Sequence, residues 1–180
     1  GMEYGIMQII CEVYDVLRTV GNCTNEQMSE IFAKWDEGQL HSYLTEITSK
    51  VLKQRDDLAD GYIVDKILNV ASYKGTGNWM LEDAIKLGCP ITVIAEAVLA
   101  RFASKATLRD GCMPEFKGKV DLNQLITKLA NAYYLASAVS YAQGFQQLSM
   151  AAKEYGWNLH YPAIAQTWEA GCIIRSLSLI

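Results

Sequence analysis

The sequence has no long apolar run. No stretch approaches about 18 uninterrupted apolar residues, the length that indicates a membrane-spanning helix, although 51% of its 180 residues are hydrophobic. The first residues, Gly1 to Tyr4, also lack the basic and then apolar layout of a secretory signal peptide. These absences predict a cytoplasmic protein with no membrane partner.

Cysteine and histidine are present but are not arranged as sites. The five cysteines are odd in number, widely scattered and form no Cys-x-x-Cys pair, so neither a disulfide framework nor a zinc site is predicted. His41 and His160 have no second histidine or carboxylate at metal-ligand spacing. No metal is therefore expected, and buried free thiols are the expected state of Cys11, Cys23, Cys89, Cys112 and Cys172.

The chain also lacks an excess of positive charge. Its 16 basic and 20 acidic side chains leave a net charge of −4. No overall positive field exists to gather nucleic acid, so a nucleic-acid partner is not expected. Any anion that the protein binds requires a local site. The length and the low glycine and proline content predict one folded domain.

Apolar residues recur at helical spacing along most of the chain, and no alternating stretch indicates a strand. Thr24 and Gln27 form a capping box, and Gly88 with Pro90 marks a helix end. The four tryptophans are expected to anchor the core. The fold class is therefore predicted to be all-α. Helices are expected over residues 2–20, 24–38, 40–52, 63–71, 79–87, 92–108 and 122–155.

An internal repeat is visible at an offset of 133 positions, which brings Trp35 onto Trp168 and Gly38 onto Gly171. We favour duplication of a helical unit, although amphipathic helices can also resemble one another by chance. Under the duplication hypothesis the second copy is incomplete, because it reaches Ile180 soon after its matching helix begins.

The segment Lys74-Gly75-Thr76-Gly77 is the first candidate site. It offers an ammonium, a hydroxyl and glycine-exposed N–H groups at the start of a helix, which suits a phosphate. It does not end as a P-loop does, and Met80 stands where a dinucleotide fingerprint needs a third glycine. Considered alone, an ordinary loop with a helix cap remains the alternative.

Two further charged residues are candidates. Arg101 lies among apolar residues, where a guanidinium needs an anionic partner or must reach water. Glu3, followed by Tyr4, begins the first helix, a position that the helix dipole alone also favours for a carboxylate. A helix-edge arginine and a dipole-stabilised glutamate remain the alternatives.

Several strings occur in order and together resemble the helical domain of decarboxylating 6-phosphogluconate dehydrogenase. The resemblance covers essentially all of residues 1–180. It implies an all-α domain with a duplicated unit, placed behind an amino-terminal dinucleotide-binding domain and forming much of a homodimer interface. The strings are Glu3-Tyr4-Gly5, Lys74-Gly75-Thr76-Gly77-x-Trp79, Glu96-Ala97-Val98-x-Ala100-Arg101, Ser140-Tyr141-Ala142-Gln143-Gly144-Phe145 and Gly171-Cys172-Ile173-Ile174-Arg175-Ser176.

The resemblance assigns roles position by position. Glu3 matches the general acid, and Tyr4, Lys74, Thr76 and Arg101 match ligands of the substrate phosphate. The implied reaction oxidises C3 of 6-phosphogluconate with NADP as hydride acceptor, releases carbon dioxide, and tautomerises the enediol to ribulose 5-phosphate. A guanidinium and an ammonium do bind a phosphate dianion strongly. A carboxyl group that acts as a general acid near neutral pH needs a raised pKa.

The resemblance also implies that part of the machinery lies outside these residues. The family's catalytic lysine, its His-Asn pair and its NADP-binding domain precede the Glu-Tyr motif, and an arginine and a histidine come from the neighbouring subunit. No dehydrogenase activity is therefore expected from this stretch alone. The family pattern is also altered at Asn69, Ser72, Tyr73, Asn78 and Glu169-Ala170.

A stand-alone helical binding or assembly module without catalytic activity is the alternative. A sister enzyme for another 3-hydroxy acid is less favoured. A substrate without phosphate gives no reason for Lys74, Thr76 and Arg101 to occur together.

Overall fold

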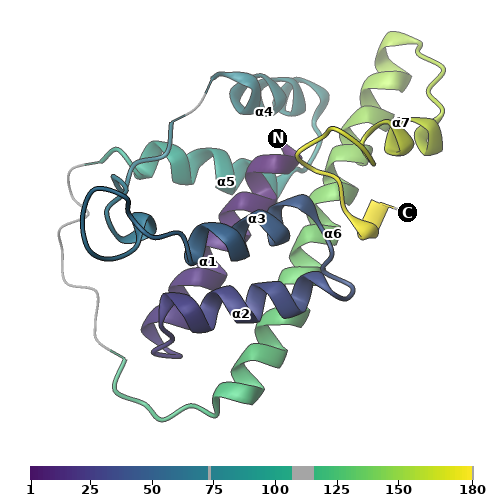
Figure 1. Cartoon of the computed structure of the whole chain (residues 1–180). Helices are drawn as coiled ribbons and strands as arrows, with labels where there is room; N and C mark the ends of the chain where they lie inside the picture. The colour runs from purple at the N-terminus through teal and green to yellow at the C-terminus, as the bar shows by residue number, and fades with distance from the viewer. Residues whose placement is uncertain (73, 107–115, 180) are drawn as a thin grey trace.

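The computed structural model describes residues 1–72, 74–106 and 116–179, apart from the side chain of Ser178. This described part is helical and contains isolated β-bridges but no strand, which confirms the all-α prediction. The helices are α1 (Met2–Thr19), α2 (Asn25–Asp36), α3 (Tyr43–Leu52), α4 (Thr76–Leu87), α5 (Thr92–Ala103), α6 (Leu122–Tyr155) and α7 (Tyr161–Thr167), with short 3-10 helices η1 (Ile63–Asp65) and η3 (Leu177–Leu179) (Figure 1).

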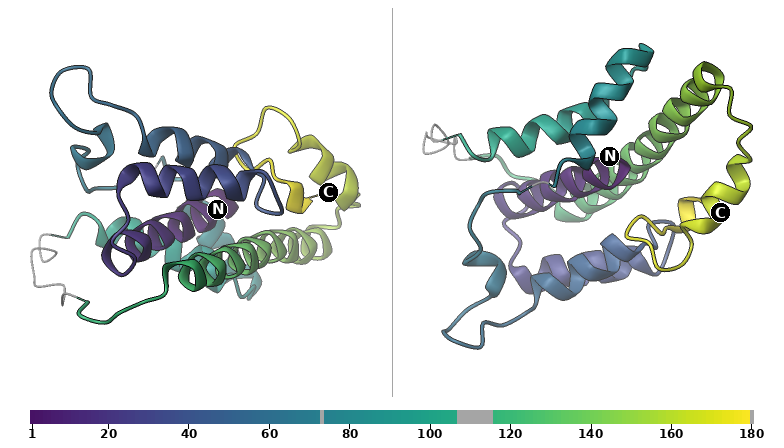
Figure 2. Two further views of the ribbon diagram at one scale, coloured as in Figure 1. Left: turned by 60° about the horizontal axis from the view of Figure 1, so that its bottom comes forward. Right: turned by 90° about the horizontal axis from the view of Figure 1, so that it is seen from above.

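Helix α1 lies at the centre of the arrangement. It packs against the 34-residue helix α6 and also contacts α2 and α5. Seen from above, α4 and α5 lie on one side of α1, and α2 and α3 lie on the other (Figure 2). The chain thus places two helix pairs on opposite sides of the α1–α6 pair.

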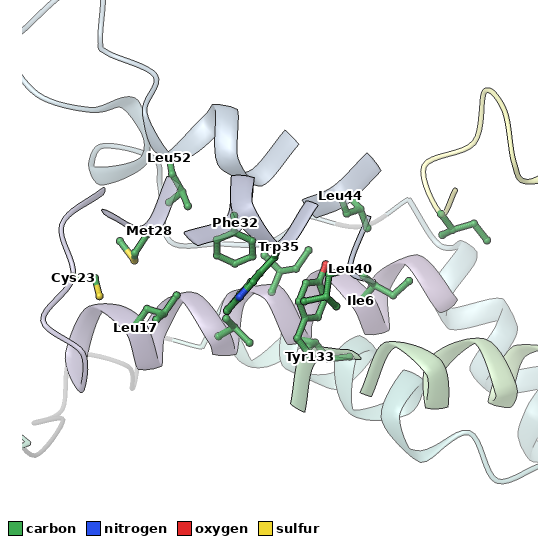
Figure 3. Packing of buried hydrophobic residues seen from close by; sticks show 14 of the residues in the cluster. Ile6, Leu17, Cys23, Met28, Phe32, Trp35, Leu40, Leu44, Leu52 and Tyr133 are labelled. Atoms are coloured by element: carbon green, nitrogen blue, oxygen red, sulfur yellow. The ribbon is translucent and has the colours of Figure 1, made fainter. Parts of the chain in front are cut away.

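The larger core lies between α1, α2, α3 and α6, where Phe32, Leu17 and Met28 are completely buried (Figure 3). The rings of Phe32 and Trp35 pack edge to face with centroids 5.1 Å apart. The buried Tyr133 hydroxyl is 2.8 Å from Thr45 Oγ1, so this polar group is satisfied within the apolar cluster.

Several predicted helix ends are confirmed, because local chemistry fixes them, but α4 begins at Thr76 rather than at Trp79. The capping box of Thr24 and Gln27 is present at the start of α2. Helix α3 begins at Tyr43, rather than near Leu40, because the Ser42 hydroxyl accepts a hydrogen bond from the Thr45 N–H. Gly88 ends α4 in a left-handed conformation.

The helix predicted over residues 63–71 is wrong. Only the 3-10 turn η1 forms, and Asp65 there binds Arg18 at 2.7 Å and Asn25 at 2.7 Å. The following apolar residues, Ile67 and Leu68, are 58% and 78% exposed. An amphipathic helix needs a surface on which to bury its apolar face, and this segment has none in the described structure.

The expectation of buried thiols is confirmed for Cys23 and Cys89 but is wrong for Cys11, which is exposed. Cys172 is half-buried, and Cys112 lies outside the described residues.

Two other expectations need correction or fall outside the structure. Trp79 and Trp157 are 65% and 52% exposed, so they are not core anchors. Helix α5 ends at Ala103, and residues 107 and 108 of the longer helix that we predicted lie outside the described residues. The duplication of a helical unit remains a prediction.

The segment near the carboxyl end is fixed to α3 and α6. Ser176 forms a β-bridge with Ser42, and the guanidinium of Arg175 lies 4.1 Å from the ring centroid of Tyr43. The buried Tyr141 hydroxyl donates to the Ile174 carbonyl oxygen at 2.8 Å. In the described part of the chain, no helix combines the length and the apolar character that crossing a membrane requires.

Replacing Tyr141 with Phe should flatten the alkaline part of the stability profile. Burial raises the pKa of Tyr141 to about 12 from an ordinary value of 10.0. The unfolded state therefore loses its proton first. Below about pH 10 the contribution of this hydroxyl is fully present, and as pH rises toward 12 it is lost at about 1.4 kcal/mol per pH unit.

Urea unfolding between about pH 7 and about pH 11 measures this slope. Tyr134→Phe on the exposed side of α6 is the matched control. Equal alkaline slopes for the two variants would contradict the assignment.

Candidate functional site

Tyr4 and Arg101 form the centre of the candidate site. The guanidinium carbon of Arg101 lies 3.6 Å from the ring centroid of the buried Tyr4. Its nitrogens donate to the Ser72 carbonyl oxygen at 2.6 Å and to Met7 Sδ at 3.8 Å. These partners carry no formal charge. The arginine is therefore positioned by neutral groups, and its positive charge is available to an anion.

The start of α4 lies against the same ring. A Cβ at Gly77 would come within 2.7 Å of Tyr4 Cε2, so this backbone approaches the ring more closely than any other residue allows. Gly75 precedes the helix with φ +98° and supplies no side-chain cap. The first N–H groups of α4 therefore lack a cap from this residue, and the positive end of the helix dipole favours an anion here.

Lys74 and Thr76 lie between these two contacts. Ser72, before them, is bonded to Arg101, and Gly77, after them, packs on Tyr4. Both side chains are exposed. The structure thus brings their segment to the Tyr4–Arg101 pair, while the contacts of the described residues do not join their side chains directly to it.

Glu3 is half-buried in the first turn of α1, directly before Tyr4. The described contacts do not connect its carboxylate with Lys74, Thr76 or Arg101. Its position next to Tyr4 in the chain is what relates it to the candidate site.

Two groups at this site were not found by sequence reasoning. They are the Ser72 carbonyl and the Met7 sulfur, which hold Arg101. Met7 follows Tyr4 by three residues and so shares its helix face, a spacing that could have identified it. A backbone carbonyl gives no signal in the sequence.

The described residues do not form a metal or dinucleotide site. Among them, no group of three or more His, Cys, Asp or Glu side chains could hold a metal ion. The Gly75-Thr76-Gly77 turn follows a loop rather than a strand, and Met80 occupies the position of a third glycine. The turn therefore does not fit the pyrophosphate of NADP as a dinucleotide fingerprint does.

Comparison with known proteins identifies the family of the chain. A family model described as "6-phosphogluconate dehydrogenase, C-terminal domain" matches residues 1–180. The chain belongs to this family. This finding confirms the resemblance inferred from the five strings.

The relatives are longer proteins. The "6-phosphogluconate dehydrogenase, decarboxylating" of Lactococcus lactis subsp. cremoris is 47% identical over 184 residues, which cover 98% of this chain and 39% of that protein. The decarboxylating enzyme 1 of Saccharomyces cerevisiae is 44% identical, with 99% and 38% covered. The chain thus spans about two fifths of the length of these relatives.

A solved structure shares the fold. The Plasmodium falciparum 6-phosphogluconate dehydrogenase, described in its apo form and in complex with its cofactor NADP+ and its substrate 6-phosphogluconate, superposes with a TM-score of 0.90. It is 37% identical, and the match covers 99% of this chain and 40% of that one. The helical arrangement described above is therefore that of the family.

The departures from the family pattern leave the central contacts in place. Ser72 acts through its backbone carbonyl, which any residue would supply. Asn78 lies in the first turn of α4, where its buried Oδ1 has no hydrogen-bond partner in the described structure. Tyr73 lies outside the described residues.

Gly77→Ala should lower the free energy of unfolding by about 1–3 kcal/mol, because the new methyl group overlaps the Tyr4 ring. Alanine favours a helix over glycine by about 1 kcal/mol, so a loss of stability reports the overlap. Urea unfolding measures it. Gly38→Ala is the control, since the nearest atom to its Cβ would be the Trp35 carbonyl oxygen at 3.9 Å. Equal or higher stability of Gly77→Ala would show that the ring moves aside freely.

Proposed function

We propose that this chain is the substrate-binding and dimerisation portion of an NADP-dependent, decarboxylating 6-phosphogluconate dehydrogenase of the pentose phosphate pathway. The observation that carries the proposal is Arg101, stacked on Tyr4 and held by neutral groups beside the open start of α4. The family membership and the descriptions of the relatives support it.

The substrate phosphate is proposed to lie between Arg101 and the start of α4. The guanidinium supplies a planar pair of donors, and Lys74 an ammonium. The hydroxyls of Thr76 and Tyr4 donate further hydrogen bonds, and the first N–H groups of α4 add the helix dipole. A chain with a net charge of −4 thus gathers a dianion through a local cationic site.

Glu3 is proposed to act as the general acid. After carbon dioxide leaves the 3-keto acid, the remaining enediol must gain a proton on carbon to become ribulose 5-phosphate. A carboxyl group that neighbours a phosphate ligand in the chain, as Glu3 neighbours Tyr4, can deliver this proton to a substrate held by its phosphate.

The hydride transfer is proposed to depend on residues outside this chain. NADP accepts the hydride from C3 in the family reaction, and the described residues do not fit its pyrophosphate. The chain alone is accordingly expected to be inactive, as the sequence predicted.

A homodimer and a cytoplasmic setting belong to the same proposal. A groove of about 610 Å³ between α1, α3 and the segment after η1 supports the dimer, because much of its lining is exposed and apolar. Val51, Ile67 and Leu68 lie at this groove. Such a patch is typical of an interaction surface, and the mass of the chain in solution tests the dimer directly.

Arg101→Ala should weaken binding of 6-phosphogluconate to the chain by about 10- to 100-fold, the effect of losing hydrogen bonds to a charged group. Isothermal titration calorimetry measures the affinity. Arg55→Ala is a matched control, because Arg55 also stacks on a tyrosine, Tyr62, at 4.0 Å but already pairs with Glu26. Equal affinities for Arg101→Ala and the unaltered chain would remove Arg101 from the phosphate site.

The catalytic role can be tested in a grafted enzyme. The chain replaces the matching portion of the Lactococcus lactis relative, and NADP reduction that depends on 6-phosphogluconate is measured. We expect activity, and a fall of about 10²- to 10⁴-fold in turnover for Glu3→Gln. Glu12→Gln, an exposed carboxylate on the same helix, should have no such effect.

Two outcomes contradict the proposal. A folded graft that binds NADP but shows no such reduction would overturn the enzyme assignment and favour the assembly module. Full turnover by Glu3→Gln would overturn the role of the acid.

A further inference from the structure

One face of helix α6 contacts α1, α4 and α5, the three helices that surround the candidate site. Gln143 and Gly144 follow Ser140 by three and four residues and precede Gln147 by four and three, so all four lie on the same side of the helix. All four are buried. This face includes part of the Ser140–Phe145 string, to which the proposed function gives no role.

The small residues of this face bring α1 close. A Cβ at Gly5 would come within 2.7 Å of Ser140 Oγ, and a Cβ at Gly144 would come within 2.6 Å of Met2 Cγ. The helix that carries Tyr4 is therefore fixed against α6 on both sides of this residue. Neither contact leaves room for a larger side chain.

Gln143 caps α5 from outside its own sequence. The residue before α5, Ile91, supplies no side-chain cap. Instead, Gln143 Oε1 accepts from the N–H groups of Val93 at 3.1 Å and Ile94 at 3.4 Å, and its Nε2 donates to Thr92 Oγ1 at 3.1 Å. These are the N–H groups that a serine or aspartate N-cap would normally satisfy.

Gln147, one turn further along, holds α4. Its Nε2 donates to the Met80 carbonyl oxygen and to Asp83 Oδ2, both at 2.9 Å. The side chain is 6% exposed, so these bonds are shielded from water. The Gln147 Oε1 is buried without a hydrogen-bond partner in the described structure, so this amide is satisfied on its donor side only.

We propose that Gln143 is a positioning residue that fixes α5 against α6 and thereby sets where Arg101 stands relative to Tyr4. Arg101 follows Val93 by about two turns of the same helix. Because a short helix moves as a rigid rod, a displacement of its first turn also displaces Arg101. Gln147 fixes α4, and with it the segment of Lys74 and Thr76. The consequence for substrate rests on the proposed function, whereas the positioning of Arg101 does not.

The test compares Gln143→Met, which keeps the size but loses the acceptor, with Gln143→Glu, which keeps an acceptor for both N–H groups. Gln146→Met, at an exposed position of the same helix, is the control. Hydrogen exchange of Val93 and Ile94 reports the cap. The NMR signals of the Arg101 side chain, shifted by the Tyr4 ring beneath it, report the position of the guanidinium.

We expect Gln143→Met to speed exchange at both amides by about tenfold and to move the Arg101 signals toward those of an unstacked arginine. Gln143→Glu and Gln146→Met should retain both properties. Unchanged Arg101 signals in a folded Gln143→Met protein would overturn the proposal. If that variant does not fold, Gln143→Asn replaces it, because its amide is one methylene too short to reach α5.

The affinity for 6-phosphogluconate separates this proposal from the function on which its consequence rests. We expect about a tenfold loss in Gln143→Met and recovery in Gln143→Glu. If the unaltered chain does not bind this ligand, the proposed function fails, and the exchange and NMR readouts still decide the role of Gln143. If it binds and Gln143→Met binds equally well, the consequence for substrate is overturned, and the NMR signals of Arg101 decide the positioning role.

Discussion

The burial of polar side chains on one face of α6 is the constraint on which the site depends. Amides that are shut off from water need donors and acceptors in the protein. Gln143 finds both at the start of α5, and Gln147 finds two acceptors on α4, while its Oε1 has no partner in the described structure. Together with the close approach of Gly5 to Ser140, these bonds define how α1, α4 and α5 are arranged around the Tyr4–Arg101 pair.

The two sides of the molecule are stabilised differently. The α2–α3 side has an extended aromatic and aliphatic core around Phe32 and Tyr133. The α4–α5 side has two small clusters, one around Ile94 and one around Tyr4 and Val98. Because less apolar surface is buried on the α4–α5 side, directional hydrogen bonds contribute more to holding its helices in place.

The electrostatics of the site follow from the same arrangement. Arg101 is held by a carbonyl oxygen, a thioether and an aromatic face, none of which neutralises it. By contrast, Arg18 and Arg55 pair with carboxylates on the opposite part of the fold. A positive charge that is held in place without a paired carboxylate can attract an anion, as the proposed function requires.

The sequence by itself determined the local features. Helix periodicity, the capping box at Thr24 and the glycine stop at Gly88 depend on near neighbours, so they could be predicted, as could the family, while the roles of Tyr4 and Arg101 remain predictions. Residues 63–71 were predicted wrongly because a helical pattern forms a helix only where a surface covers its apolar face. The contacts of the Ser72 carbonyl and of Gln143 could not be predicted, because each has a partner 29 or more residues away in the chain. Only the packing of α1, α4 and α5 onto α6 brings such groups together.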